Sequence, residues 1–140
     1  MIENIPADEK IQTQVSSTCP RRVLLVEDDR SLRRYLEVVL SREGYEVIAA
    51  VDGLEAMRAT LTSHVDLVVT DAIMPNLNGY ELVRFLRSTP QLAHLPIVLL
   101  SALDIKEDAN EVHKADVYLS KPVSPEALID CLETLMRQSG

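Results

Sequence analysis

The sequence predicts an α/β fold: a parallel β-sheet with helices on both of its faces. Five short apolar segments recur along the chain from residue 22, and segments with helical spacing separate and follow them. Three of the apolar segments are apolar at odd and even positions alike, as strands buried on both faces are. Strands that alternate with helices are typical of parallel sheets. The length of 140 residues suits one domain.

The expected strands differ in how deeply they are buried. The segments 22–26, 65–70 and 96–100 are almost entirely apolar and are expected at the centre of the sheet. In 45–51 polar and apolar residues alternate more clearly, which favours a strand at an edge. The last expected strand covers 116–120.

Helical spacing of apolar residues predicts five helices, of which the fourth has the weakest pattern because charged residues are frequent in it. Gly44 is expected to end the first helix and Ser124 to cap the last one. In the second helix the expected apolar face contains Leu54, Met57 and Leu61. The helices are expected over 30–43, 53–62, 79–88, 104–114 and 125–137.

Composition limits the classes of function. The formal net charge of −8 disfavours direct binding of nucleic acid, which needs a basic surface. Cys19 and Cys131 lack the spacing of a disulfide framework or a metal site. No apolar run approaches the ~18 residues of a membrane span, and the N-terminus lacks the basic start and apolar centre of a signal peptide. We expect a flexible tail at 1–20, one domain at 21–138, a cytoplasmic location and no membrane partner.

Ionisable and hydroxyl side chains follow the expected strands directly. Because parallel strands end at the same edge of a sheet, these side chains are expected to converge on one edge. Carboxylates crowded together repel unless something neutralises them. In chain order the residues are Glu27, Asp28, Asp29, Asp52, Asp71, Ser101, Ser120 and Lys121.

This set of side chains predicts magnesium-assisted phosphoryl transfer onto Asp71. Magnesium prefers oxygen ligands, usually a few carboxylates and waters. A hydroxyl and an ammonium group suit the oxygens of a phosphoryl group, and a carboxylate can itself be the nucleophile. The simpler alternative is that acids at strand ends cap the next helix, as expected for Asp29 and Asp52, and an isolated Asp71 would be a cap or turn residue. Complementary groups at three strand ends favour the chemical interpretation.

The same residues resemble the receiver domain of response regulators of two-component systems. The resemblance covers about 21–138 and rests on the ordered segments "VLLVEDD", "DLVVTDAIMPNLNG", "LLSA" and "YLSKP". Each segment alone is a weak signal, and the ordered set is specific. The resemblance implies a flavodoxin-like, doubly wound sheet of order 2-1-3-4-5 with five helices.

The resemblance also implies roles at the metal site. Asp71 would be the phosphoacceptor, and the cofactor would be magnesium or manganese. Its protein ligands would be Asp28, Asp71, Glu27 as an outer partner, and the backbone carbonyl of Ile73. The peptide bond before Pro122 is expected to be cis.

Further roles concern the phosphoryl group and the response to it. Ser101 and Lys121 would hold the phosphoryl oxygens, with help from the backbone N–H groups of Ala72 and Ala102. Ser101 and Tyr118 would be the switch residues, since the aromatic ring turns inward when the hydroxyl moves toward the phosphate. No classical enzymatic activity is expected beyond this self-catalysed transfer.

The implied phosphodonor is a phosphohistidine on a sensor histidine kinase or a phosphotransfer protein. The chain's own histidines are not needed, and His64, His94 and His113 are expected at the surface. The downstream partner is an unspecified protein, and a phosphorylation-dependent homodimer is compatible with the family. Both a stand-alone receiver and a piece of a longer protein remain open.

The sequence departs from the family pattern in two places. Ile73 and Leu103 occupy positions that often orient the attacking water, and neither can hydrogen-bond to it, so we expect slow self-dephosphorylation. The spacing of 20 residues from Ser101 to Lys121 is about two shorter than in the family, and the usual glycine before the last strand is missing. Either the fourth helix is short, shifted or partly unwound, or the change is a harmless loop deletion.

Two other functions compete with this interpretation. An aspartyl-phosphate phosphatase would need a second acid two residues after Asp71, where this chain has Ile73. A constitutive pseudo-receiver, which binds partners without phosphorylation, usually lacks the acceptor, an acid or the lysine. Here Asp71, Asp28 and Lys121 are all present, so a phosphorylation-dependent switch is favoured.

Overall fold

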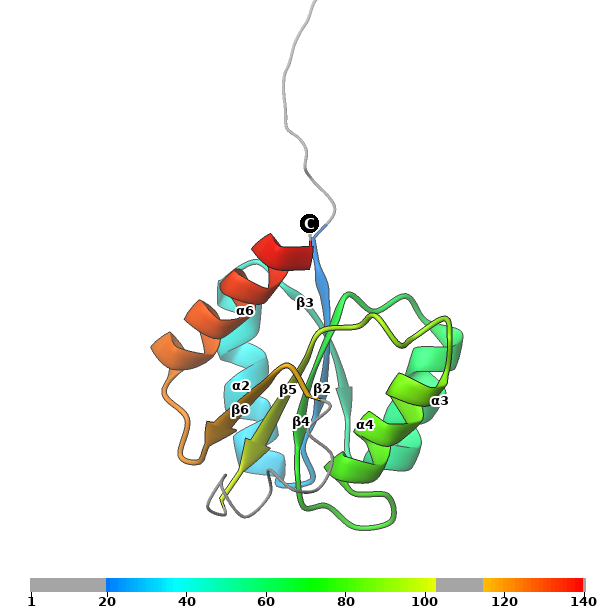
Figure 1. The fold of residues 1–140 in the computed structure, drawn as a ribbon. Coiled ribbons are helices and arrows are strands. Elements are labelled where there is room, and N and C mark those ends of the chain that lie inside the picture. The colour runs from blue at the N-terminus through cyan, green and yellow to red at the C-terminus, as the bar shows by residue number, and fades with distance from the viewer. Residues whose placement is uncertain (1–19, 103–114, 140) are drawn as a thin grey trace, which may run out of the picture.

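A computed structural model describes residues 20–102 and 115–139 (Figure 1). These form five strands and four of the five predicted helices; the predicted helix 104–114, Leu103, His113 and most of the predicted tail lie outside the described residues. The elements are β2 (Arg22–Val26), α2 (Arg30–Arg42), β3 (Glu46–Ala50), α3 (Gly53–Thr62), β4 (Leu67–Asp71), α4 (Gly79–Ser88), β5 (Ile97–Ser101), β6 (Val117–Ser120) and α6 (Pro125–Ser139).

The strands form one parallel sheet in the order β3-β2-β4-β5-β6. Numbered along the chain, this is the predicted order 2-1-3-4-5. The chain passes from β2 outward to β3 and then crosses back to β4, so the strand order reverses between β2 and β4. Ligands of open α/β folds bind at the carboxyl ends of the strands where the order reverses. A ligand site is therefore expected at the carboxyl ends of β2 and β4.

The helices cover both faces of the sheet, with α2 and α6 on one face and α3 and α4 on the other (Figure 1). Alternate residues of each central strand therefore enter separate cores. Val23 and Leu25 pack into the core beneath α2 and α6, whereas Leu24 and Val26 pack into the core beneath α3 and α4. This arrangement explains the apolar residues at both parities. The edge position of β3 confirms the prediction drawn from its alternating pattern.

Local signals in the sequence place the helix ends. Asp29 accepts a hydrogen bond from the N–H of Leu32 at 3.1 Å and caps α2. Ser124 accepts one from the N–H of Ala127 at 3.1 Å and caps α6. Gly44 has φ 94°, the left-handed conformation that commonly follows a helix, and ends α2. These predicted caps and the predicted helix end are confirmed. No helix in the described ranges has the length and hydropathy that crossing a bilayer requires.

The predicted apolar face of α3 was only partly right: Met57 packs against the core, but the other two predicted residues do not. Leu54 and Leu61 are 51% and 64% exposed, and the buried residues of α3 are Gly53, Ala56 and Thr60. The small side chains let the helix approach the loop after β4: the N–H of Gly53 donates to the carbonyl of Leu77 at 3.1 Å, and a Cβ at Gly53 would overlap that carbonyl. Close approach between the backbones decided which face of α3 is buried.

Candidate functional site

Three carboxylates meet at the carboxyl edge of the sheet, where the strand order reverses. Glu27 and Asp28 follow β2, and Asp71 is the last residue of β4. Each offers an oxygen, and these oxygens lie within 4.8 Å of one another. Glu27 and Asp71 are 1% and 6% exposed, whereas Asp28 is exposed. Oxygen ligands so arranged, with one side open to solvent, suit a magnesium or manganese ion.

Lys121 lies between the two buried carboxylates. Its Nζ is 3.0 Å from Oδ2 of Asp71 and 3.2 Å from Oε1 of Glu27. The residue follows β6, its backbone N–H donates to the carbonyl of Ser101 at 2.8 Å, and its peptide bond to Pro122 is cis. The sheet thus brings together two groups that are far apart in the sequence, the carboxylate of Asp71 and the ammonium of Lys121, in direct contact.

Protonation at this edge follows from burial and from neighbouring charges. Burial raises the pKa of Glu27 to about 7, and the negative charge of Asp71 acts in the same direction. The N–H of Asp29 and the ammonium of Lys121 oppose this rise in pKa. For Lys121, burial alone would lower the pKa, but the hydrogen bond with Asp71 and the charges of Asp71 and Glu27 outweigh it and raise the pKa. Lys121 therefore stays charged at neutral pH, while Glu27, whose pKa is raised, favours taking up a proton or lying beside a cation.

The predicted switch residues lie on neighbouring strands beside Asp71. Ser101 is buried and comes one residue after Leu100, which pairs with Asp71. Tyr118 is half-buried, pairs with Leu99 and packs against the core beneath α3 and α4. Because side chains alternate along a strand, Ser101 and Tyr118 face the same side of the sheet. A shift of the Ser101 hydroxyl toward Asp71 would free space next to the ring of Tyr118.

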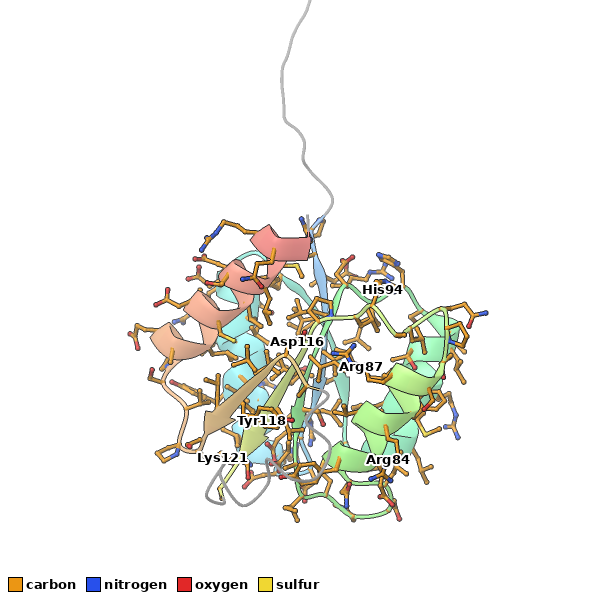
Figure 2. The ribbon with its side chains drawn as sticks, viewed as in Figure 1. Arg84, Arg87, His94, Asp116, Tyr118 and Lys121 are labelled. Atoms are coloured by element: carbon orange, nitrogen blue, oxygen red, sulfur yellow. The ribbon has the colours of Figure 1, made fainter. Side chains whose placement is uncertain are left out.

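The two ends of β6 have different environments. At the start, Asp116 accepts hydrogen bonds from the N–H of Ile97 at 2.7 Å and from Nη2 of Arg87 at 2.9 Å. Figure 2 shows Arg87 and Asp116 together at this end, with Tyr118 and Lys121 farther along the strand. The ion pair between Arg87 and Asp116 holds the start of β6 in place. Lys121 follows the other end of this strand and lies next to the carboxylates.

The loop after Asp71 carries two of the predicted backbone groups. The N–H of Ala72 donates to the carbonyl of Leu100 at 2.8 Å, so it would have to share this bond to hold a phosphoryl oxygen. Ile73 is 57% exposed and brings no polar side-chain atom to the site. Gly79 closes the loop with a hydrogen bond from its N–H to the carbonyl of Ala72 at 2.8 Å, where a Cβ would overlap the carbonyl of Asp71. Ala102 is exposed next to Ser101.

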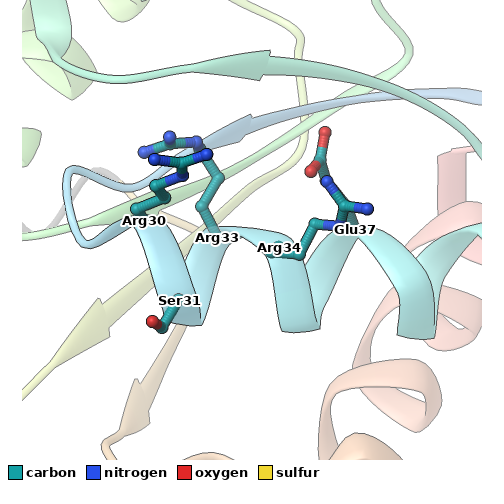
Figure 3. Close-up of a pocket in the computed structure, with 5 residues that line it drawn as sticks. All are labelled: Arg30, Ser31, Arg33, Arg34 and Glu37. Atoms are coloured by element: carbon teal, nitrogen blue, oxygen red, sulfur yellow. The ribbon is translucent and has the colours of Figure 1, made fainter.

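Arginines at the start of α2 were not singled out from the sequence. Arg30, Arg33 and Arg34 line a pocket of about 460 Å³ along this helix (Figure 3). Nη1 of Arg33 donates to the backbone carbonyl of Glu27 at 2.8 Å, which ties the helix to the acidic edge. The run "DDRSLRR" contains the signal, but only the turn between β2 and α2 brings Arg33 back onto Glu27.

Comparison with known proteins agrees with this geometry. Residues 23–133 match the model of the response regulator receiver domain. The chain is 41% identical over 123 residues to the response regulator MprA of Mycobacterium sp. strain KMS, covering 86% of this chain and 53% of MprA. It is 35% identical over 123 residues to the transcriptional regulatory protein GltR of Pseudomonas aeruginosa, covering 85% of this chain and 50% of GltR. The chain thus spans about half the length of the curated relatives it matches.

Solved structures give the same result. The chemotaxis protein CheY4 of Vibrio cholerae superposes with a TM-score of 0.76 at 32% identity, covering 83% of this chain and 98% of CheY4. The response regulator TrrA of Thermotoga maritima, solved in complex with Mg(2+)-BeF, gives a TM-score of 0.75 at 30% identity, covering 82% and 98%. The chain belongs to the family of response regulator receiver domains of two-component systems.

Proposed function

We propose that this receiver domain accepts a phosphoryl group on Asp71 with magnesium and thereby changes a partner-binding face. The observation that carries the proposal is the contact of Asp71 with Lys121 at 3.0 Å, inside a cluster that Glu27 and Asp28 complete. An acceptor carboxylate, a cation and a candidate metal site are all present at one sheet edge. The donor would be a phosphohistidine of a sensor histidine kinase or a phosphotransfer protein.

The residues that would hold the metal ion are Asp28, Asp71, Glu27 as an outer partner, and Ile73 through its backbone carbonyl. The cluster of carboxylate oxygens within 4.8 Å supports this assignment for the three acids. TrrA, a structural relative, was solved with magnesium, which agrees with the choice of ion. When bound, magnesium supplies the positive charge that lets an anionic phosphoryl group approach several carboxylates.

In the transfer step, a carboxylate oxygen of Asp71 forms a bond to phosphorus while the N–P bond of the donor histidine breaks. The electron pair of that bond remains on the imidazole nitrogen. Lys121 and the hydroxyl of Ser101 donate hydrogen bonds to the phosphoryl oxygens, where charge-assisted bonds are strongest. The N–H groups of Ala102 and, by sharing its bond to Leu100, Ala72 would complete the set.

The response follows from the added charge. A phosphoryl group adds ~1.5–2 negative charges and draws the hydroxyl and the ammonium toward it. Ser101 then vacates space on the face of the sheet that it shares with Tyr118, and the ring can turn inward. The face around β6 thus has two arrangements, which an unspecified protein partner or a second copy of the chain would distinguish.

The proposal is tested by intact-mass measurement after incubation with a small phosphodonor. We expect a mass increase of one phosphoryl group when magnesium is present and none when a chelator removes it. Peptide mapping should locate the group on Asp71. A constitutive binding module would instead bind its partner equally before and after incubation, and that result would overturn the switch.

The phosphorylated form is expected to be long-lived because Ile73 cannot orient water. Replacing it by a residue that can, Ile73→Asn, should accelerate loss of the phosphoryl group by about tenfold or more, since positioning of a nucleophile contributes strongly to rate. Decay would be followed by mass spectrometry after the phosphodonor is removed, with magnesium present.

Leu61→Asn is the matched control, because Leu61 is also an exposed apolar residue but lies near the end of α3. Its decay should equal that of the unmodified chain. Loss of the phosphoryl group within seconds in the unmodified chain would contradict a slow intrinsic decay.

A further inference from the structure

A side-chain bridge joins the start of α3 to the loop that follows Asp71. Nδ2 of Asn76 donates to Oδ2 of Asp52 at 2.7 Å, while Oδ1 of Asp52 accepts from the N–H of Glu55 at 2.9 Å and caps α3. The hydrogen bonds from the N–H of Glu55 and from Asn76 lower the pKa of Asp52, so its carboxyl group is ionised at neutral pH. Asp52 thus uses one oxygen for its own helix and the other for the loop.

The same loop is attached at several further points. The N–H of Gly53 donates to the carbonyl of Leu77 at 3.1 Å, beside the bridge. The carbonyl of Ala72 accepts from the N–H of Gly79, and the side chain of Met74 is buried. Ile73 therefore lies in a loop whose ends and middle are both fixed.

Asn76 holds a backbone conformation that needs support. Its φ is 68°, in the left-handed region that residues with a side chain rarely adopt and that Asn tolerates better than most. The hydrogen bond to Asp52 stabilises this conformation from outside the loop. If it is lost, the loop can relax toward other conformations, which would alter the path of the chain from Met74 to Leu77.

We propose that Asp52 and Asn76 are positioning residues of the metal site, whose hydrogen bond keeps the loop in the conformation that presents the carbonyl of Ile73 to the cation. The inference rests on the proposed function, because it takes that carbonyl as a metal ligand. Neither side chain would contact the ion. The expected effect follows from population: the apparent dissociation constant rises in inverse proportion to the fraction of molecules whose loop is in the binding conformation.

Two single variants distinguish an effect of the hydrogen bond between Asp52 and Asn76 from effects of the helix cap and of the charge of Asp52. In Asp52→Asn the new amide keeps its oxygen for the cap, which Asn forms well, but the charge-assisted bond from Asn76 is lost, and a turned Asn76 amide could replace it only with a weaker neutral bond. Asn76→Gly keeps the charge of Asp52 and tolerates the positive φ, yet removes the donor. Each should weaken binding of Mn²⁺ about three- to tenfold, the range of one net hydrogen bond. Binding would be measured on the whole chain by electron paramagnetic resonance of free Mn²⁺.

Exchanging the two residues should restore the bridge. In the double variant Asp52→Asn/Asn76→Asp, the amide introduced at position 52 can donate to the carboxylate introduced at position 76 while its oxygen still caps α3. The net charge is that of the unmodified chain. We expect the affinity for Mn²⁺ to return to within about twofold of the original value, whereas a role in stability alone would leave it unchanged in all three variants.

Asp66→Asn is the matched control. Asp66 also uses two oxygens, accepting from the N–H of Arg22 at 2.7 Å and lying 2.9 Å from Nε2 of His64, but it precedes β4 at the opposite edge of the sheet. This variant should keep the original affinity for Mn²⁺. Urea unfolding of every variant would show how much stability each substitution removes.

The outcomes distinguish this inference from the proposed function. Asp28→Asn should weaken Mn²⁺ binding strongly, and unchanged binding there would overturn the metal site itself. If Asp28→Asn weakens binding but Asp52→Asn and Asn76→Gly match Asp66→Asn, the positioning role alone is overturned. It is also overturned if only Asp52→Asn weakens binding, because charge would then be the cause, or if the exchange of the two residues gives no recovery.

Discussion

Asp71→Asn is expected to abolish phosphorylation of this chain and to leave its fold intact. An amide oxygen is a far weaker nucleophile than a carboxylate and cannot form the acyl phosphate. The substitution also removes one of the three carboxylates that would share the metal ion. Because Asn has nearly the shape of Asp and Lys121 keeps its contact with Glu27, no cavity forms and the remaining buried charges stay paired.

The measurement is the intact mass after incubation with magnesium and a small phosphodonor, together with the urea midpoint of the variant. Asp66→Asn, the same chemical change at the opposite edge of the sheet, should be phosphorylated like the unmodified chain. A phosphoryl-sized mass increase that persists in Asp71→Asn would place the acceptor elsewhere.

Lys121→Met is expected to have the next largest effect. The ammonium lies 3.0 Å from Asp71 and 3.2 Å from Glu27, and methionine keeps the apolar stem while removing the charge. Loss of a donor aimed at charge that develops in a transition state typically costs about 10²–10³ in rate. We therefore expect phosphorylation from the small phosphodonor to slow by about a hundredfold, followed by mass spectrometry over time.

The same variant should lose stability in a pH-dependent manner. The charge of Lys121 lowers the pKa of Glu27, so removal of this charge should raise that pKa further above about 7. The pKa of Glu27 is higher in the folded state than its unfolded value of 4.5. Its protonation therefore contributes stability that is fully present below pH 4.5 and is lost as the pH rises through the folded pKa. The loss of stability should thus be small at pH 5 and larger at pH 8, on the order of 2–4 kcal/mol at most.

Urea unfolding at both pH values without divalent cations would measure this difference. The comparison is between Lys121→Met and the unmodified chain at each pH, which cancels the contribution of groups that the substitution does not affect. An equal loss at pH 5 and pH 8 would show that the ionisation of Glu27 does not depend on Lys121.

Local features of the sequence predicted most of the fold. The caps at Asp29 and Ser124 and the helix end at Gly44 depend on backbone groups within a few residues, so the types of these residues were sufficient. The parallel sheet followed from alternation of strands and helices, and its edge brought Glu27 and Asp71 together as expected. The family resemblance supplied the strand order, which alternation does not determine.

Features that depend on distant backbone contacts were predicted poorly. The apolar spacing of α3 pointed to Leu54 and Leu61, but close approach to Leu77 required the face with Gly53 and Ala56. The N–H of Ala72 donates to the carbonyl of Leu100, a contact that follows from the register of β4 against β5 and was not predicted. Neither contact is visible in the spacing of residues along one segment.

By itself, the sequence determined the alternation of strands and helices, the residues at strand ends and thus the chemical groups available at one edge. These features arise from short-range backbone geometry and from burial of apolar residues. The tertiary structure decided which of those groups touch: Lys121 with Asp71 and Glu27, Arg33 with the carbonyl of Glu27, and Asp52 with Asn76. Such contacts need distances of about 3 Å between residues far apart in the chain, and only the packing of helices, loops and sheet sets them.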